Sequence, residues 1–283
     1  MTSPILSVYW NDAEGQGRGY KRPSTGEQVP GVTSITGLVN KNLAQWGSDK
    51  AVEWMTANWF LWNPGGKSDE KAFNHARYKW RDFRDERGAV GDGVHNHIED
   101  YILGRNPDPE FLDAEQQHII RNFEEFEFFT GVEYVSTETT VWGDKFAGTL
   151  DALAYMHSPR LGRKVLSVLD WKTSRKAWPD MYMQISALMN ADLRFVQVAE
   201  GEGDKFTRKR PDGTINTTYW REELMPEVES GFIVHLTQDG WAVHEITDTD
   251  LHYDRFLAYR DAWWSEKALK LKGWKLDKAL AAD

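Results

Sequence analysis

Two short segments of this 283-residue chain place acidic and basic side chains where they could do chemistry. The first, GTLD, ends at Asp151, and the second, LDWK, contains Asp170 and Lys172. Side chains alternate between the two faces of a β-strand, so Asp170 and Lys172 would point one way and Trp171 the other. A partner strand at 146–156 would bring Asp151 beside them. The sequence therefore predicts two carboxylates and one ammonium group clustered at strand ends.

The surroundings of Asp170 leave two interpretations of this cluster open. Asp170 follows VLSVL, a run that is apolar on both faces, as expected of a central strand. An ionised carboxylate there is costly unless it is paired or bound to a metal ion. One interpretation is a structural ion pair between Asp170 and Lys172. The other is a metal site, because carboxylate oxygens are the ligands that Mg²⁺ prefers.

A second candidate ligand lies in the stretch GDGVHNHIED at 91–100. His95 and Glu99 are four residues apart, which places them on one face of a helix beside an apolar stripe. His97 lies about 200° away from His95 around the same helix, so the two histidines cannot hold one ion. The contiguous H-N-H is also not the pattern of the HNH nucleases, whose three residues are spread over a ββα unit. On its own His95 would be an ordinary buried or capping histidine, and only the motifs downstream make it a candidate ligand. His97 is expected at the surface or in a supporting position around the site.

The elements that must position these residues follow from periodicity and from turn-forming residues. Helical spacing predicts three helices in the first half, at 41–62 with an interruption near Gly47, at 70–104 and at 113–130. Strands are predicted at 133–143, 144–157, 162–174 and 194–199, a hairpin at 230–246, and further helices at 178–192 and 249–276.

These elements predict one α/β (α+β) domain with an N-terminal helical elaboration. We divide the chain into an N-terminal cap and helical part (1–132), a catalytic sheet core (133–200), a polar insert (201–222) and a terminal hairpin and helix (223–283).

Composition excludes several classes of protein. A net charge of −10 argues against a general nucleic-acid coat protein, although it leaves room for a small basic cleft. The absence of cysteine excludes disulfides, thiolate zinc sites and iron–sulfur clusters. No run of about 18 apolar residues and no signal-peptide layout is present. We therefore expect a cytoplasmic protein with no membrane partner.

The order of these motifs resembles that of the PD-(D/E)XK nucleases. GTLD, a hairpin of suitable length, D-x-K and then a helix carrying Gln184 occur in the order used by that superfamily, in particular by its RecB-like branch and the stand-alone phage exonucleases within it. RecB-like members also carry a helix G-x-x-x-H-x-x-x-E before the sheet, which Gly91, His95 and Glu99 match. On this resemblance Glu99 would hold the second nitrogen of His95; an ordinary exposed helix acid is the alternative.

Weaker matches extend the resemblance over residues 30 to about 190. VPGVTSITGLV followed by Leu43 and Trp46 is similar to the start of many phage RecB-like exonucleases. Glu138 lies in a strand where the family often has an acid, although TETT could equally be a solvated strand face. Gln184 begins the family's Q-x-x-x-Y helix motif, but Leu188 stands at the tyrosine position, which puts the DNA-contacting role of Gln184 in doubt.

The resemblance implies a central mixed β-sheet flanked by helices, that is, a restriction-endonuclease-like core, with its active site at the mouth of a DNA cleft. Asp151, Asp170 and Lys172 would be catalytic. Mg²⁺ or Mn²⁺ would be held by His95, Asp151, Asp170 and the backbone carbonyl of Trp171. Lys172 would orient and polarise the attacking water, and no iron–sulfur cluster is expected.

Contacts with DNA must come from local positive charge in this acidic chain. The candidates are the segment after the catalytic lysine, a basic helix that also carries Arg77 and Arg81, and the insert; a solvated basic surface is the alternative for each. The candidate residues are Thr173, Ser174, Arg175, Lys176, Arg84, Arg87, Lys205, Arg208, Lys209 and Arg210.

The leading hypothesis is a metal-dependent exonuclease that acts on linear DNA ends in phage or bacterial recombination, replication or repair, beside a helicase or recombination protein. A structure-selective endonuclease or nickase on the same scaffold is the nearest alternative. A non-catalytic module that binds DNA ends, and a purely structural network of acids, are the alternatives from other classes.

Overall fold

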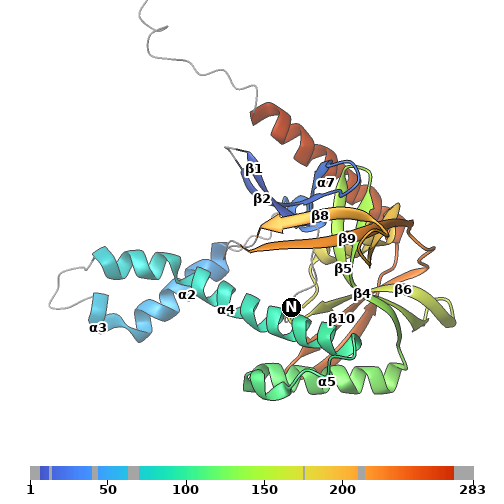
Figure 1. The fold of residues 1–283 in the computed structure, drawn as a ribbon. Helices are drawn as coiled ribbons and strands as arrows, with labels where there is room; N and C mark the ends of the chain where they lie inside the picture. The colour runs from blue at the N-terminus through green and yellow to red at the C-terminus, as the bar shows by residue number, and fades with distance from the viewer. Residues whose placement is uncertain are drawn as a thin grey trace, which may run out of the picture.

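The computed structural model describes residues 7–12, 15–39, 44–62, 70–174, 176–209 and 214–270 (Figure 1). The predicted residues Leu43, Arg175 and Arg210 lie outside these ranges. The strands are β1 (Ser7–Asp12), β2 (Gly15–Lys21), β3 (Gln28–Pro30), β4 (Glu133–Gly143), β5 (Phe146–Ser158), β6 (Arg163–Lys172), β7 (Leu193–Val198), β8 (Asp204–Lys209), β9 (Ile215–Leu224), β10 (Ser230–Thr237) and β11 (Gly240–Glu245). The helices are α1 (Val32–Thr36), α2 (Ala44–Ala57), α3 (Trp59–Trp62), α4 (Glu70–Ile102), α5 (Ala114–Thr130), α6 (Pro179–Met189) and α7 (Thr249–Lys270), with a short 3-10 helix at Pro109–Phe111.

The main sheet has eight strands in the order β11-β10-β6-β5-β4-β7-β9-β8. β10 runs parallel to β6, and the other neighbours are antiparallel, so the sheet is mixed as predicted. The three N-terminal strands form a separate sheet in the order β1-β2-β3. Helices α1 to α5 all precede β4 in the chain, which confirms the N-terminal helical elaboration. None of the helices in the described ranges is long and apolar enough to cross a membrane.

Helices cover both faces of the main sheet, and each face buries its own apolar core. On one face α4 and α5 pack against the sheet through a core that includes Ile98, Phe123 and Trp171. On the other, α1, α6 and α7 pack through a core that includes Ile185 and Phe256. Burial of apolar side chains on both faces explains why β6 is apolar on both sides.

One local prediction was wrong, and one segment has a structure that the sequence did not predict. The break in the helical stretch 41–62 lies at Asn58, between α2 and α3, whereas Gly47 lies inside α2 beside Trp80. A glycine within a helix costs only about 1 kcal/mol, which packing of α2 on α4 offsets. The polar insert is a β-hairpin, because β8 and β9 pair and extend the sheet. Its alternation buries Phe206 and Trp220, a pattern that its polar residues concealed.

The terminal hairpin β10–β11 was predicted correctly, but its position in the sheet was not evident from the sequence. β10 pairs directly with β6, in the register Ile233 with Asp170. The strand that carries the candidate catalytic residues therefore lies inside the sheet, between β5 and a strand about 60 residues later in the chain.

Glycines at two positions should respond to alanine in opposite directions. A Cβ added at Gly148 would lie 2.6 Å from Leu188 and 3.1 Å from Val32, so Gly148→Ala should overpack this contact and lower the free energy of unfolding by about 1–3 kcal/mol. Gly88, inside α4, has nothing within 4 Å of an added Cβ, so Gly88→Ala should raise that free energy by about 0.5–1 kcal/mol. Urea unfolding of both variants checks this, and equal effects would contradict the assigned packing.

Candidate metal centre

The site lies where strands β5 and β6 separate. Their ladder ends at Ala152 and Leu169, although β6 goes on pairing with β10 and β5 goes on pairing with β4. Asp151 and Asp170, the next residues along each strand, therefore lie at a fork in the sheet. The amide of Trp171 has no ladder partner on β5 and donates to Asp151 Oδ2 at 2.8 Å instead. The fork thus holds the two predicted acids together.

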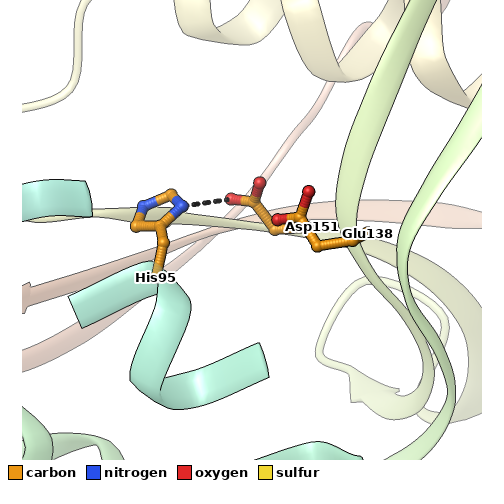
Figure 2. A group of neighbouring side chains, drawn as sticks. All are labelled: His95, Glu138 and Asp151. Atoms are coloured by element: carbon orange, nitrogen blue, oxygen red, sulfur yellow. Dashed lines mark ion pairs between the residues drawn. The ribbon is translucent and has the colours of Figure 1, made fainter. Parts of the chain in front are cut away.

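Helix α4 brings His95 to this fork from the adjoining face of the sheet. His95 Nδ1 lies 3.7 Å from Asp151 Oδ2, and His95 Nε2 lies 3.1 Å from the carbonyl oxygen of Trp171. The side chains of His95, Glu138 and Asp151 converge (Figure 2). Each of them offers one ligand atom, and these three atoms lie within 4.8 Å of one another. This group of one imidazole and two carboxylates, which we call the metal group, could hold a metal ion.

Glu138 joins the group because the backbone of β4 is irregular at this residue. Its φ is 48°, in the left-handed region, between Thr137, which pairs with Ala152, and Thr139, which pairs with Leu150. This conformation costs a residue with a Cβ about 1–2 kcal/mol, and such strain is concentrated at functional sites. Glu138 was predicted only in a supporting role, because the bend that turns its carboxylate toward Asp151 leaves no signal in TETT.

Asp170 and Lys172 form an ion pair, which confirms that they share one face of β6. The Asp170 side chain is almost fully buried and accepts a hydrogen bond from Gln184 Nε2 at 3.2 Å. Burial raises the pKa of Asp170 to about 6, with Lys172 opposing the shift and Asp151 adding to it. Burial also lowers the pKa of Lys172, but Asp170 and Asp151 outweigh that and raise it. The lysine is therefore charged at neutral pH.

The remaining predicted ligands and supports lie around one cavity of about 400 Å³. Asp170 lines it, but its carboxylate contacts Lys172 and Gln184 and lies outside the group formed by His95 and its two acids. Glu99 also lines the cavity, is buried, and lies 3.9 Å from Arg105 Nη1. Its support of His95 stays a prediction.

Trp171 and His97 are neighbours in sequence of the candidate site residues, and their side chains point away from the site, as the sequence predicted. The Trp171 ring packs edge-on against Phe123 and Phe126 at centroid distances of 5.7 and 6.0 Å. His97 lies on α4 away from the three ligands, where burial lowers its pKa and Glu124 opposes that shift. His95 alone of the two histidines belongs to the metal group.

The predicted DNA contacts nearest the site follow β6. Gly91 explains how α4 approaches them, because a Cβ there would lie 3.3 Å from Thr173 Oγ1. Ser174 Oγ donates to the carbonyl of Lys176 at 3.1 Å, and Lys176 Nζ lies 5.2 Å from the ring centre of Trp178. This segment is held by its own contacts beside the cavity.

The other predicted DNA contacts are dispersed. Arg84 pairs with Asp85 at 2.7 Å, and Arg87 pairs with Glu115 at 2.5 Å. Lys205 is exposed on β8, far along the sheet from β6. Arg208 and Lys209 belong to β8, and their side chains lie outside the described part of the chain.

A scan against models of known protein families finds no match, and a search of curated proteins finds no similar sequence. The function is therefore inferred from the geometry of this site and from the order of its residues along the chain.

The burial of Asp170 predicts a specific pH dependence. Its pKa is about 6 in the folded protein against 3.8 for an ordinary aspartate, so folding takes up a proton. Protonated Asp170 therefore makes its full contribution to stability below pH 3.8, and this contribution is lost as the pH rises through about 6. In EDTA, we expect this group to reduce the free energy of unfolding by up to about 3 kcal/mol between pH 4 and 7. Urea unfolding of wild type and Asp170→Asn checks this, and an equal slope in both would contradict it.

Proposed function

We propose that this protein is a divalent-metal-dependent deoxyribonuclease, and specifically an exonuclease acting on linear DNA ends. The observation that carries the proposal is the convergence of His95, Glu138 and Asp151 beside a buried Asp170–Lys172 pair in one cavity. A purely structural ion pair would need neither the three convergent ligands nor the strained backbone at Glu138. The resemblance to RecB-like nucleases agrees with this assignment.

The donor set fits Mg²⁺ or Mn²⁺. Two carboxylates suit either ion, and the imidazole of His95 favours Mn²⁺ over Mg²⁺ because it is the softer ligand. A bound ion would supply an activated water, orientation of the phosphate and neutralisation of developing charge. The Trp171 carbonyl lies 3.1 Å from His95 Nε2, whereas His95 Nδ1 is the nitrogen beside Asp151, so this contact would orient the imidazole, and the carbonyl as a metal ligand stays a prediction.

The chain's own residues would do the remaining work. Lys172, held by Asp170, would donate hydrogen bonds to the attacking water or to a phosphate oxygen and would offset negative charge there. Gln184 fixes the orientation of Asp170 through its amide. Asp151 both holds the Trp171 amide and presents its carboxylate to His95, so that it ties β6 to the metal group.

Digestion of defined DNA substrates tests the proposal. Linear DNA labelled at its ends and closed circular DNA, each single and double stranded, are incubated with Mg²⁺, Mn²⁺ or EDTA. We expect metal-dependent digestion of linear molecules only. Cutting of circles would favour the structure-selective endonuclease or nickase. Binding without cutting of any substrate would favour the non-catalytic end-binding module and would overturn the enzymatic proposal.

We further propose that this activity serves recombination, replication or repair in the cytoplasm of a bacterial or phage-infected cell, beside a helicase or recombination protein. The support is the resemblance and the order of the motifs. Co-purification of tagged protein from infected or uninfected cells tests it, and recovery of no DNA-processing partner would count against it.

A further inference from the structure

One continuous helix connects the metal group to a projecting part of the molecule. α4 has 33 residues and is therefore about 50 Å long. Its C-terminal half carries His95 and packs on the sheet, whereas its N-terminal half packs with α2 and α3. Figure 1 shows α2, α3 and this half of α4 standing away from both sheets. We call this part, residues 44–62 and 70–90, the arm.

Three arginines on the arm lie on the same side of α4 as His95. Arg77, Arg81 and Arg84 are exposed, and they precede His95 by 18, 14 and 11 residues. At 100° per residue, all four fall within a sector of about 60°, and Arg77 lies five full turns, or about 27 Å, from His95. We call these three residues the arginine row.

The arginine row has little local acid to neutralise it. No carboxylate in the described ranges pairs with Arg77 or Arg81. Arg84 pairs with Asp85, but both side chains are exposed, and such pairs contribute little to stability. From residue 71 to residue 87 the chain has six Lys or Arg and three Asp or Glu, although its net charge is −10. The segment 71–87 of α4 therefore carries a local excess of positive charge within an acidic chain.

Aromatic rings lie between the arginines. The Arg81 guanidinium is 4.5 Å from the ring centre of Tyr78 and 5.5 Å from that of Trp80, and Arg84 is 5.4 Å from Trp80. Tyr78 is 45% exposed, and Trp59 on α3 is 59% exposed. Guanidinium groups recognise phosphates, and exposed rings stack on unpaired bases.

Two of the residues between the arginine row and His95 on this side of α4 are glycines. Gly88 lies on the same side of α4, and nothing is within 4 Å of a Cβ added there. Gly91 follows, beside Thr173 at the end of β6. We infer that the arginine row binds the backbone of single-stranded DNA and directs the strand past Gly88 and Thr173 to the metal group. The inference rests on the proposed function and adds to it the strand type and the route.

Salt dependence of binding provides the first test. Binding of a labelled single-stranded oligonucleotide in EDTA is measured by fluorescence anisotropy for wild type and for the triple variant Arg77→Gln, Arg81→Gln, Arg84→Gln. Each phosphate contact on a single strand contributes about 0.7 to the slope of log Kd against log salt, so the slope should fall by about 2 in the triple variant. The matched control is Lys79→Gln, which removes a cation paired with Asp82 from the other side of α4 and should leave the slope unchanged.

Crosslinking tests the route. The chain has no cysteine, so Gly88→Cys provides a single thiol for a photoreactive label. Glu86→Cys, two residues earlier and about 200° away on α4, is the matched control. We expect labelled single-stranded DNA to crosslink at residue 88 and not at residue 86, and we expect duplex of the same sequence to crosslink more weakly at residue 88.

The outcomes separate this inference from the proposed function. An unchanged slope in the triple variant, equal crosslinking at residues 86 and 88, or preference for duplex would overturn the strand route, even if wild type digests DNA. A reduced slope with crosslinking at residue 88 only would support the route, even if no digestion occurs. The inference would also be overturned if the arm bound a protein partner and had no affinity for DNA.

Discussion

Replacing Lys172 by methionine should reduce DNA hydrolysis by about 10²–10³-fold in a digestion assay with saturating Mn²⁺. The variant keeps the length of the side chain but loses the ammonium group that pairs with Asp170. It would also leave a buried carboxylate without its counter-charge, which costs about 3–5 kcal/mol before protonation relieves part of it. Activity and urea unfolding are therefore measured together.

Two further variants separate chemistry from folding in this experiment. Asp170→Asn combined with Lys172→Met replaces both charges by neutral groups, and it should recover most of the stability but none of the activity. Lys164→Met changes a lysine at the other end of β6, where the side chain is exposed and pairs with Glu133, and it should leave hydrolysis unchanged. Activity that returns with stability in the double variant would show that Lys172 is structural.

Replacing Asp151 by asparagine should remove metal binding while the fold persists. Asparagine keeps an oxygen that can accept from the Trp171 amide, but it loses the charge that the metal group needs. Wild type at a Mn²⁺ concentration 100 times Kd should gain about 2.7 kcal/mol in the free energy of unfolding, seen as a rise in Tm. We expect Asp151→Asn and His95→Ala to lose this gain and to lose hydrolysis with it.

His97→Ala is the matched control for the metal experiment. It removes an imidazole two residues from His95 on the same helix, yet His97 does not belong to the metal group. The gain in Tm with Mn²⁺ should persist in this variant. If His97→Ala abolished the gain, or if Asp151→Asn kept it, the ion would have to bind somewhere other than the fork between β5 and β6.

Several features of the site could be predicted because they depend on local geometry. Strand alternation placed Asp170 and Lys172 on one face, and their ion pair confirms it. Helical periodicity separated His95 from His97, and the metal group contains only the first. The pattern of hydrophobic residues also predicted most elements, and the resemblance implied the mixed sheet.

Other features were decided by tertiary structure. The place of Glu138 in the metal group depends on its left-handed conformation within β4, between two residues that pair with β5. The position of β10 beside β6, the hairpin β8–β9 at the sheet edge, and the fork that brings Asp151 to Trp171 all join segments far apart in the chain. Local sequence determines which face of its own element a side chain occupies. Which elements meet depends on long-range burial and pairing, and these created the fork in which the candidate ligands converge.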